Sequence, residues 1–166
     1  MSIDDVTYAT VLAATVLSIG IAAASALGDK TWHELLDRYQ AVLGRQTTRA
    51  RGRVIKSTGD GLLATFDGPA RAVRCGFAMR QAVAEMNLGI KIGLHTGEIE
   101  LMGDDIGGIA VHVAARIAAL AEVGEVLTSS TVKDLVAGSG LRFADRGVQP
   151  LKGLDDPYRL LAVEAA

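Results

Sequence analysis

The stretch "KSTGDGLLATF", residues 56–66, places a Gly-Asp-Gly turn directly before an apolar segment. With "RVI" ahead of it, it forms two β-rich segments around Gly59-Asp60-Gly61, a pattern typical of a hairpin with Asp60 at its tip. Glycines let the backbone approach a metal or phosphate, and an exposed carboxylate there binds hard cations. The tripeptide alone favours a plain Asp-Gly turn, and the cation site stays open as the alternative at this point.

The segments on either side alternate between helical and strand patterns. Residues 29–52 and 68–87 carry apolar residues at helical spacing, as do residues 109–124. The remaining segments read as strands at 89–101, 124–130 and two within 141–164, a loop at 103–108 ("GDDIGG") and a short helix at 131–136. The order predicts an α+β fold with mostly antiparallel strands, in a single domain of residues 1–166 with its core at about 8–163.

The run "TYATVLAATVLSIGIAAASAL", Thr7 to Leu27, has no charged residue. At about 21 residues it has the length of a membrane-spanning helix. It is rich in Ala, Ser, Thr and Gly, however, and the start "MSIDD" lacks the positive charge of a signal peptide. A strand is needed before the hairpin to complete the core. We therefore expect a strand at Thr10 to about Leu17 and a helix beginning at Ile21, with no membrane anchor.

Composition narrows the class of protein further. The formal net charge of −2 over 166 residues gives no basic surface for a nucleic-acid polymer. The single cysteine, Cys75, excludes an intrachain disulfide and fits the reducing cytoplasm. No reactive motif surrounds Cys75, so we expect it on the packed side of a helix.

Four polar residues have spacings that suggest a ligand site. His112 and Arg116 lie at i and i+4, on one face of a predicted helix that otherwise carries small residues. Lys56 lies on the strand that enters the hairpin, and Asp105 lies in the loop before the helix. Arg suits charge on a phosphoryl group and Lys can donate a hydrogen bond to a ligand. Solvated surface charges and a turn aspartate are the alternative for each residue alone.

Together, "KSTGDGLLATF", "GLHTGEIEL", "GDDIGGIAVHVAARI", "GEVLTS" and "LKG" resemble the catalytic domain of class III nucleotidyl cyclases, most of all bacterial adenylyl cyclases. The likeness covers about Leu27 to Val163. It implies a ferredoxin-like βαββαβ core with added elements, dimerised head to tail, with two active sites at the interface. The implied reaction is the lyase step of cyclic AMP signalling. ATP becomes 3′,5′-cyclic AMP and pyrophosphate, with two divalent cations, Mg²⁺ or Mn²⁺, as cofactors.

The resemblance also assigns roles to residues. It places Lys56 and Asp105 at the positions that read adenine, since lysine donates to N1 and a carboxylate accepts from the 6-amino group. Arg116 matches the arginine that stabilises charge at the α-phosphate. His112 stands where the family often has asparagine, close to the ribose. Lys152 is a weaker match to a lysine that touches the triphosphate.

The metal position is where the chain departs from the family. Asp60 matches the second metal-binding aspartate, and in the dimer it would serve one site while the other matched residues of its chain serve the second. Counting back from Leu27, the first aspartate should fall at Val16, which cannot bind a cation. This predicts a severe loss of cyclase activity, by about three decades or more. The alternatives are a nucleotide-binding or regulatory domain without turnover, and an N-terminal stretch altered from the natural chain.

Overall fold

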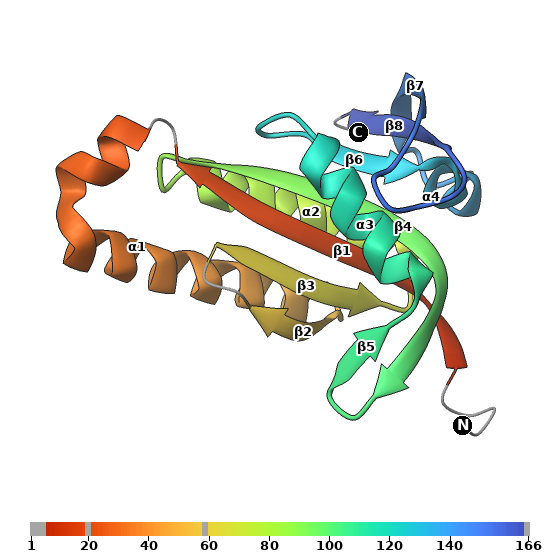
Figure 1. Cartoon of the computed structure of the whole chain (residues 1–166), viewed down its shortest axis with the longest axis horizontal. Helices are drawn as coiled ribbons and strands as arrows, with labels where there is room; N and C mark the ends of the chain where they lie inside the picture. Colours follow the sequence, from red (N-terminus) through yellow and green to blue (C-terminus); the bar gives the residue numbers. More distant parts are fainter. Residues whose placement is uncertain (1–5, 19–20, 58–59, 165–166) are drawn as a thin grey trace.

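The computed structural model describes residues 6–18, 21–57 and 60–164, without the side chains of residues 6–8, 14–18, 21–27 and 29. The strands and helices follow one another along the chain as shown in Figure 1. Their order and bounds are β1 (Val6–Ser18), α1 (Ile21–Arg49), β2 (Arg53–Ser57), β3 (Gly61–Phe66), α2 (Pro69–Ala84), β4 (Leu88–Met102), β5 (Asp105–Gly107), α3 (Ile109–Leu120), β6 (Val126–Ser129), α4 (Ser130–Leu135), β7 (Arg142–Gln149) and β8 (Tyr158–Glu164).

The first half of the described chain is a ferredoxin-like unit, as predicted. The sheet order is β2-β3-β1-β4-β6-β8-β7, and β5 pairs with β4 off this path. The strands β2, β3, β1 and β4 are joined by antiparallel ladders, and the β4–β6 ladder is parallel. The long strands β1 and β4 pair along most of their length and run side by side through the middle of the sheet (Figure 1).

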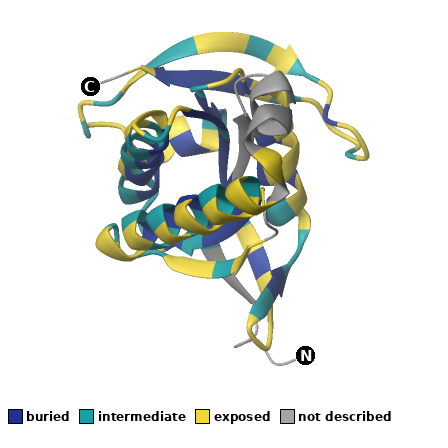
Figure 2. Ribbon diagram, turned by 90° about the vertical axis from the view of Figure 1, so that its left-hand side faces the viewer, coloured by how far each residue is buried: buried dark blue, intermediate teal, exposed yellow. Residues whose placement is uncertain are grey.

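Helices cover both faces of this sheet, and strand alternation explains how. Leu12 of β1 is buried with Tyr39 of α1 and Met79 of α2 in one cluster. Its neighbours Val11 and Ala13 are buried on the other side, with residues of α3. Because successive side chains of a strand point to opposite faces, β1 contributes to both layers. The helices turn their buried residues toward the sheet and their exposed ones outward (Figure 2).

The C-terminal part extends the sheet and carries α3 against it. Strand β8 pairs with both β6 and β7. The buried face of α3, which includes Val113 and Ile117, packs on Leu127 of β6, Leu160 of β8 and Leu151 from the β7–β8 connection. This packing fixes the connection, residues 150–157, relative to α3.

The N-terminal run is a strand followed by a helix, as predicted. Its strand is longer than expected, since β1 covers Val6–Ser18. Helix α1 begins at Ile21 and is interrupted at Gly28, whose φ of 76° is outside the helical range. Within the part of the chain that the structure describes, no helix is long and apolar enough to cross a membrane.

Other expectations are confirmed, with one correction. Cys75 is buried on the packed side of α2, and burial raises the pKa of its thiol to about 11. The segment "GDDIGG" is not wholly a loop, because Asp105–Gly107 forms the short strand β5, which pairs with the end of β4. The arm formed by β5 and the end of β4 extends away from the rest of the sheet (Figure 1).

Candidate active site

Lys56 and Asp105, far apart in the sequence, form an ion pair between the end of β2 and the start of β5. Lys56 Nζ lies 3.2 Å from Asp105 Oδ1 and donates to Oδ2 at 3.3 Å. Asp105 Oδ1 also accepts the backbone N–H of Ile106 at 2.8 Å. This backbone hydrogen bond, followed by the bond from Lys56, lowers the pKa of Asp105. Both side chains stay half-exposed, so a donor and an acceptor are presented together to solvent.

A second ion pair ties the same arm to β2. Arg53 Nη2 lies 3.6 Å from Asp104 Oδ1, and both side chains are exposed. Exposed pairs of this kind contribute little to stability. The pair lies beside the Lys56–Asp105 pair and joins the same two parts of the chain.

His112, Arg116 and Lys152 line one pocket of about 330 Å³. Helix α3 supplies the first two residues from its exposed face, because its opposite face is packed in the core. Lys152 comes from the β7–β8 connection. The other residues of the lining are Ile109, Gly153, Leu154, Asp155, Asp156 and Tyr158. The pocket therefore gathers two cationic side chains and an imidazole, with two carboxylates and an aromatic ring that sequence reasoning did not assign to the site.

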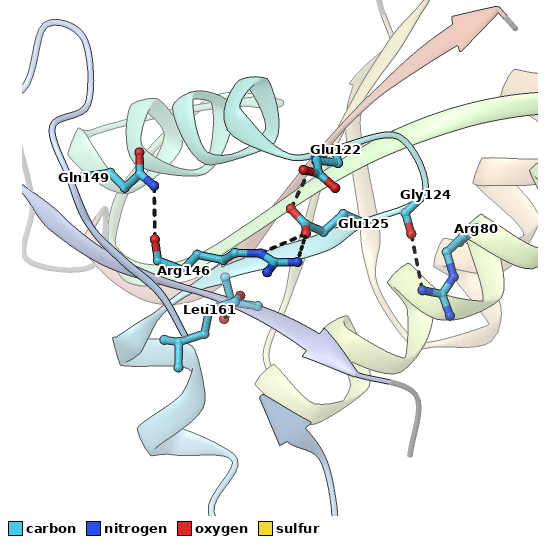
Figure 3. A network of polar contacts seen from close by, with 8 residues as sticks. Arg80, Glu122, Gly124, Glu125, Arg146, Gln149 and Leu161 are labelled. Carbon is cyan, nitrogen blue, oxygen red and sulfur yellow. Dashed lines mark hydrogen bonds and ion pairs between the residues drawn. The ribbon is translucent and has the colours of Figure 1, made fainter. Parts of the chain in front are cut away.

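A polar network holds the turn that follows α3 (Figure 3). Arg146 of β7 donates to Glu125 Oε2 from Nη2 at 2.8 Å and from Nε at 3.2 Å. Glu125 Oε1 accepts the backbone N–H of Glu122 at 3.3 Å, and Arg80 donates to the carbonyl of Gly124 at 3.3 Å. The turn is thus bound to α2 and to β7, the strand that leads into the Lys152 connection.

Asp60 is exposed and directly precedes β3, whose first residue pairs with Thr15 near the C-terminal end of β1. The hydroxyl of Tyr39 donates to the Asp60 carbonyl at 3.4 Å, and Gln40 donates to the carbonyl of Gly61 at 3.0 Å. The β1–β3 ladder ends with the pair Thr15–Gly61, so Val16 follows the last paired residue of β1 and Asp60 precedes the last paired residue of β3. Residues 58 and 59 of the predicted turn lie outside the described residues.

The side chains present here do not fit a pair of divalent ions. Among residues 6–18, 21–57 and 60–164, no three His, Cys, Asp or Glu side chains come together in a possible metal site. Mg²⁺ requires near-octahedral oxygen coordination, usually with one or two carboxylates. Asp60 supplies one carboxylate and Val16 supplies none, so this donor set falls short of a two-ion site.

The fold is that of the class III adenylyl and guanylyl cyclase catalytic domains, as the resemblance in the sequence predicts. The adenylyl cyclase CyaB from P. aeruginosa superposes with a TM-score of 0.86 at 21% identity, covering 97% of this chain and 96% of that one. The Adenylate/Guanylate Cyclase/Hydrolase from Silicibacter pomeroyi gives a TM-score of 0.82 at 28% identity, covering 97% and 98%.

Sequence comparison points the same way. The chain is 34% identical over 142 residues to the Rhizobium meliloti protein named "Putative adenylate cyclase 3", covering 80% of this chain. It spans only 24% of that relative's length. An uncharacterised Mycobacterium tuberculosis protein is 35% identical over 103 residues, covering 60% of this chain and 35% of its own length. No family model matches the chain.

Proposed function

We propose that this domain binds ATP and converts it to 3′,5′-cyclic AMP and pyrophosphate in sites shared across a homodimer, with turnover severely reduced by Val16. The observation that carries the proposal is the Lys56–Asp105 pair, two residues distant in sequence that meet at 3.2 Å. The pocket of His112, Arg116 and Lys152 supports it independently.

The Lys56–Asp105 pair suits adenine better than guanine. The ammonium can donate to adenine N1 and the carboxylate can accept from the 6-amino group. Guanine has a protonated N1 and a 6-oxygen, so it presents a donor to the lysine and an acceptor to the carboxylate. Because an ammonium has three donors, Lys56 can contact the base while keeping one bond to Asp105. This favours ATP over GTP as substrate.

The pocket on α3 suits the phosphate end of the nucleotide. In the reaction, the 3′-hydroxyl gives its proton to solvent and its oxygen bonds to the α-phosphorus, while pyrophosphate leaves with the electron pair of the broken P–O bond. Arg116 presents a planar fork of donors to the charge that gathers on the α-phosphate oxygens. Lys152 would add a point charge for the leaving pyrophosphate, and the resemblance gives His112 a hydrogen bond near the ribose. We assign these roles from the resemblance and from the shared pocket.

A homodimer explains why the matched residues of one chain do not form a complete active site by themselves. Leu101 and Met102 on the arm are exposed, as is Ile109 at the start of α3, with exposed fractions from 42% to 65%. Exposed apolar side chains near a polar site are common where a second protein surface covers them. A second copy of this chain would also bring its own Asp60 toward the nucleotide.

A specific observation favours a second candidate, a nucleotide-binding regulatory domain without turnover. Valine, rather than a carboxylate, stands at the position that the resemblance assigns to the first metal-binding aspartate. Such a domain would keep the adenine and phosphate contacts and lose only the chemistry. The two candidates therefore differ in product formation and agree in ATP binding.

The test measures both properties on the purified protein. We expect calorimetry to detect ATP binding that Arg116→Ala abolishes and that Lys133→Ala, an exposed lysine of α4 outside the pocket, leaves unchanged. Cyclic AMP production with Mg²⁺ or Mn²⁺ should be slow but above that of Arg116→Ala. Binding with no product at all would favour the regulatory domain. Absence of ATP binding by the unaltered protein would refute both.

A further inference from the structure

Tyr158, the first residue of β8, lines the same pocket as Arg116 and Lys152. The residue is half-buried, and no hydrogen bond within the described part of the chain reaches its hydroxyl. An oxygen without a partner would count as buried and unpaired if solvent did not reach it, and this one does not. The hydroxyl therefore lies on accessible surface. A phenol that is fixed by its ring and free at its hydroxyl can donate to a ligand.

A buried histidine supports the Tyr158 ring. His95 of β4 is 7% exposed, and its Nδ1 lies 2.7 Å from Ser129 Oγ of β6. Its ring meets the Tyr158 ring edge to face, with centroids 5.7 Å apart and planes at 83°. Burial lowers the pKa of His95 to about 4, so the imidazole is neutral near pH 7. The contact between the two rings is therefore one of aromatic packing.

We infer that Tyr158 is a nucleotide-contacting residue, whose hydroxyl donates to an anionic oxygen of the polyphosphate, and that His95 is its positioning residue. The inference rests on the proposed function, because Arg116 and Lys152 must attract the phosphates into the pocket. Phosphate oxygens accept hydrogen bonds and carry no donor near neutral pH, so they match a phenol. The Ser129–His95 bond fixes the imidazole, and the contact with the imidazole limits how the phenol ring can turn.

The test of Tyr158 compares two ligands with one variant. Tyr158→Phe removes the hydroxyl and keeps the ring, so we expect about tenfold or more weaker binding of a non-reacting ATP analogue, as for a lost bond to a charged group. Binding of adenosine, which has no phosphate, should not change. An unchanged affinity for the ATP analogue, with loss of binding in Arg116→Ala, would overturn this inference and leave the proposed function standing. Absence of binding by the unaltered protein would remove the proposed function itself.

The test of His95 asks whether its effect passes through the Tyr158 hydroxyl. His95→Leu removes both the Ser129 bond and the ring contact, and we expect it to weaken ATP-analogue binding several-fold in the unaltered background. In the Tyr158→Phe background it should add nothing, because the group that it positions is gone. Equal losses in both backgrounds would show a merely structural role. If His95→Leu fails to fold, Ser129→Ala replaces it, since this variant removes only the bond that orients the imidazole.

Discussion

Replacing Val16 by aspartate should restore divalent-ion binding beside Asp60. The β1–β3 register ends at Thr15 and Gly61, so positions 16 and 60 are each the next residue beyond that last pair. Facing residues of an antiparallel pair have Cα atoms about 4.5–5.5 Å apart. Two carboxylates at that separation can place oxygens on one ion, whose ligands lie at about 2.1 Å for Mg²⁺.

The expected gain is large in rate. A missing ligand at a two-ion site plausibly removes about 4 kcal/mol of transition-state stabilisation, which corresponds to about three decades in kcat. Without the ion, the two carboxylates repel each other, so Val16→Asp should be less stable than the unaltered chain in a chelator. With the ion at a hundred times its Kd, binding returns about 2.7 kcal/mol of stability. Rate and ion-dependent stability should therefore rise together.

The assay measures cyclic AMP formation and the thermal midpoint at increasing Mg²⁺ and Mn²⁺. Val16→Asn is the matched control, because asparagine has nearly the same size as aspartate and carries no charge. We expect only the aspartate variant to gain activity and an ion-dependent midpoint. If Val16→Asp gains neither, position 16 is not the metal position, and the explanation for reduced turnover is wrong. If it gains stability without activity, the domain belongs to the regulatory candidate.

Three further predictions test the base contacts, the packing and the pH response. Lys56→Glu with Asp105→Cys should shift nucleotide preference from ATP toward GTP, measured by competition binding, and an unchanged preference would refute the adenine assignment. Gly93→Ala should destabilise the domain by more than about 2 kcal/mol in urea unfolding, because the added Cβ would lie 2.6 Å from the Ala114 carbonyl of α3; a midpoint shift within error would refute the close packing of α3 on β4. The pKa of His95 falls from 6.5 to about 4 on folding, so the unfolded chain binds more protons between these values and stability should fall by about 3 kcal/mol as pH drops from 7 to 4. Urea titrations over this range check the slope, and His95→Leu should flatten it.

Periodicity in the sequence was sufficient for most of the fold. The need for a strand before the hairpin, to complete the core, located β1 inside a run that has the length of a membrane span. The hairpin signal at Asp60 predicted two strands that the β2–β3 ladder confirms. The sequence did not predict strand β5, because its three residues are too few to show alternation. Its pairing depends on the end of β4. The kink at Gly28 follows from a backbone angle that composition does not specify.

The candidate site, too, could be predicted from the sequence only in part. The spacing of His112 and Arg116 predicts a shared helix face, and the structure brings both into one pocket. Lys152 joins them only because Leu151 packs under α3, a long-range contact that local pattern does not encode. Tyr158 gave no signal at all, since a tyrosine at the start of a strand is an ordinary strand former. Its place in the site depends on which side chains lie across the pocket.

The residues that hold this fold are largely separate from those that would bind the nucleotide. The core clusters are apolar and buried, whereas Lys56, Arg116 and Lys152 are exposed and sit on elements fixed by packing elsewhere. Valine at position 16 agrees with this separation, because a β-branched residue suits a strand and the β1–β4 ladder continues through Val16 to Ser18. A change at the metal position therefore leaves the frame for the adenine and phosphate contacts in place. Under the proposed function, loss of the metal ligand would therefore remove cyclisation and leave ATP binding.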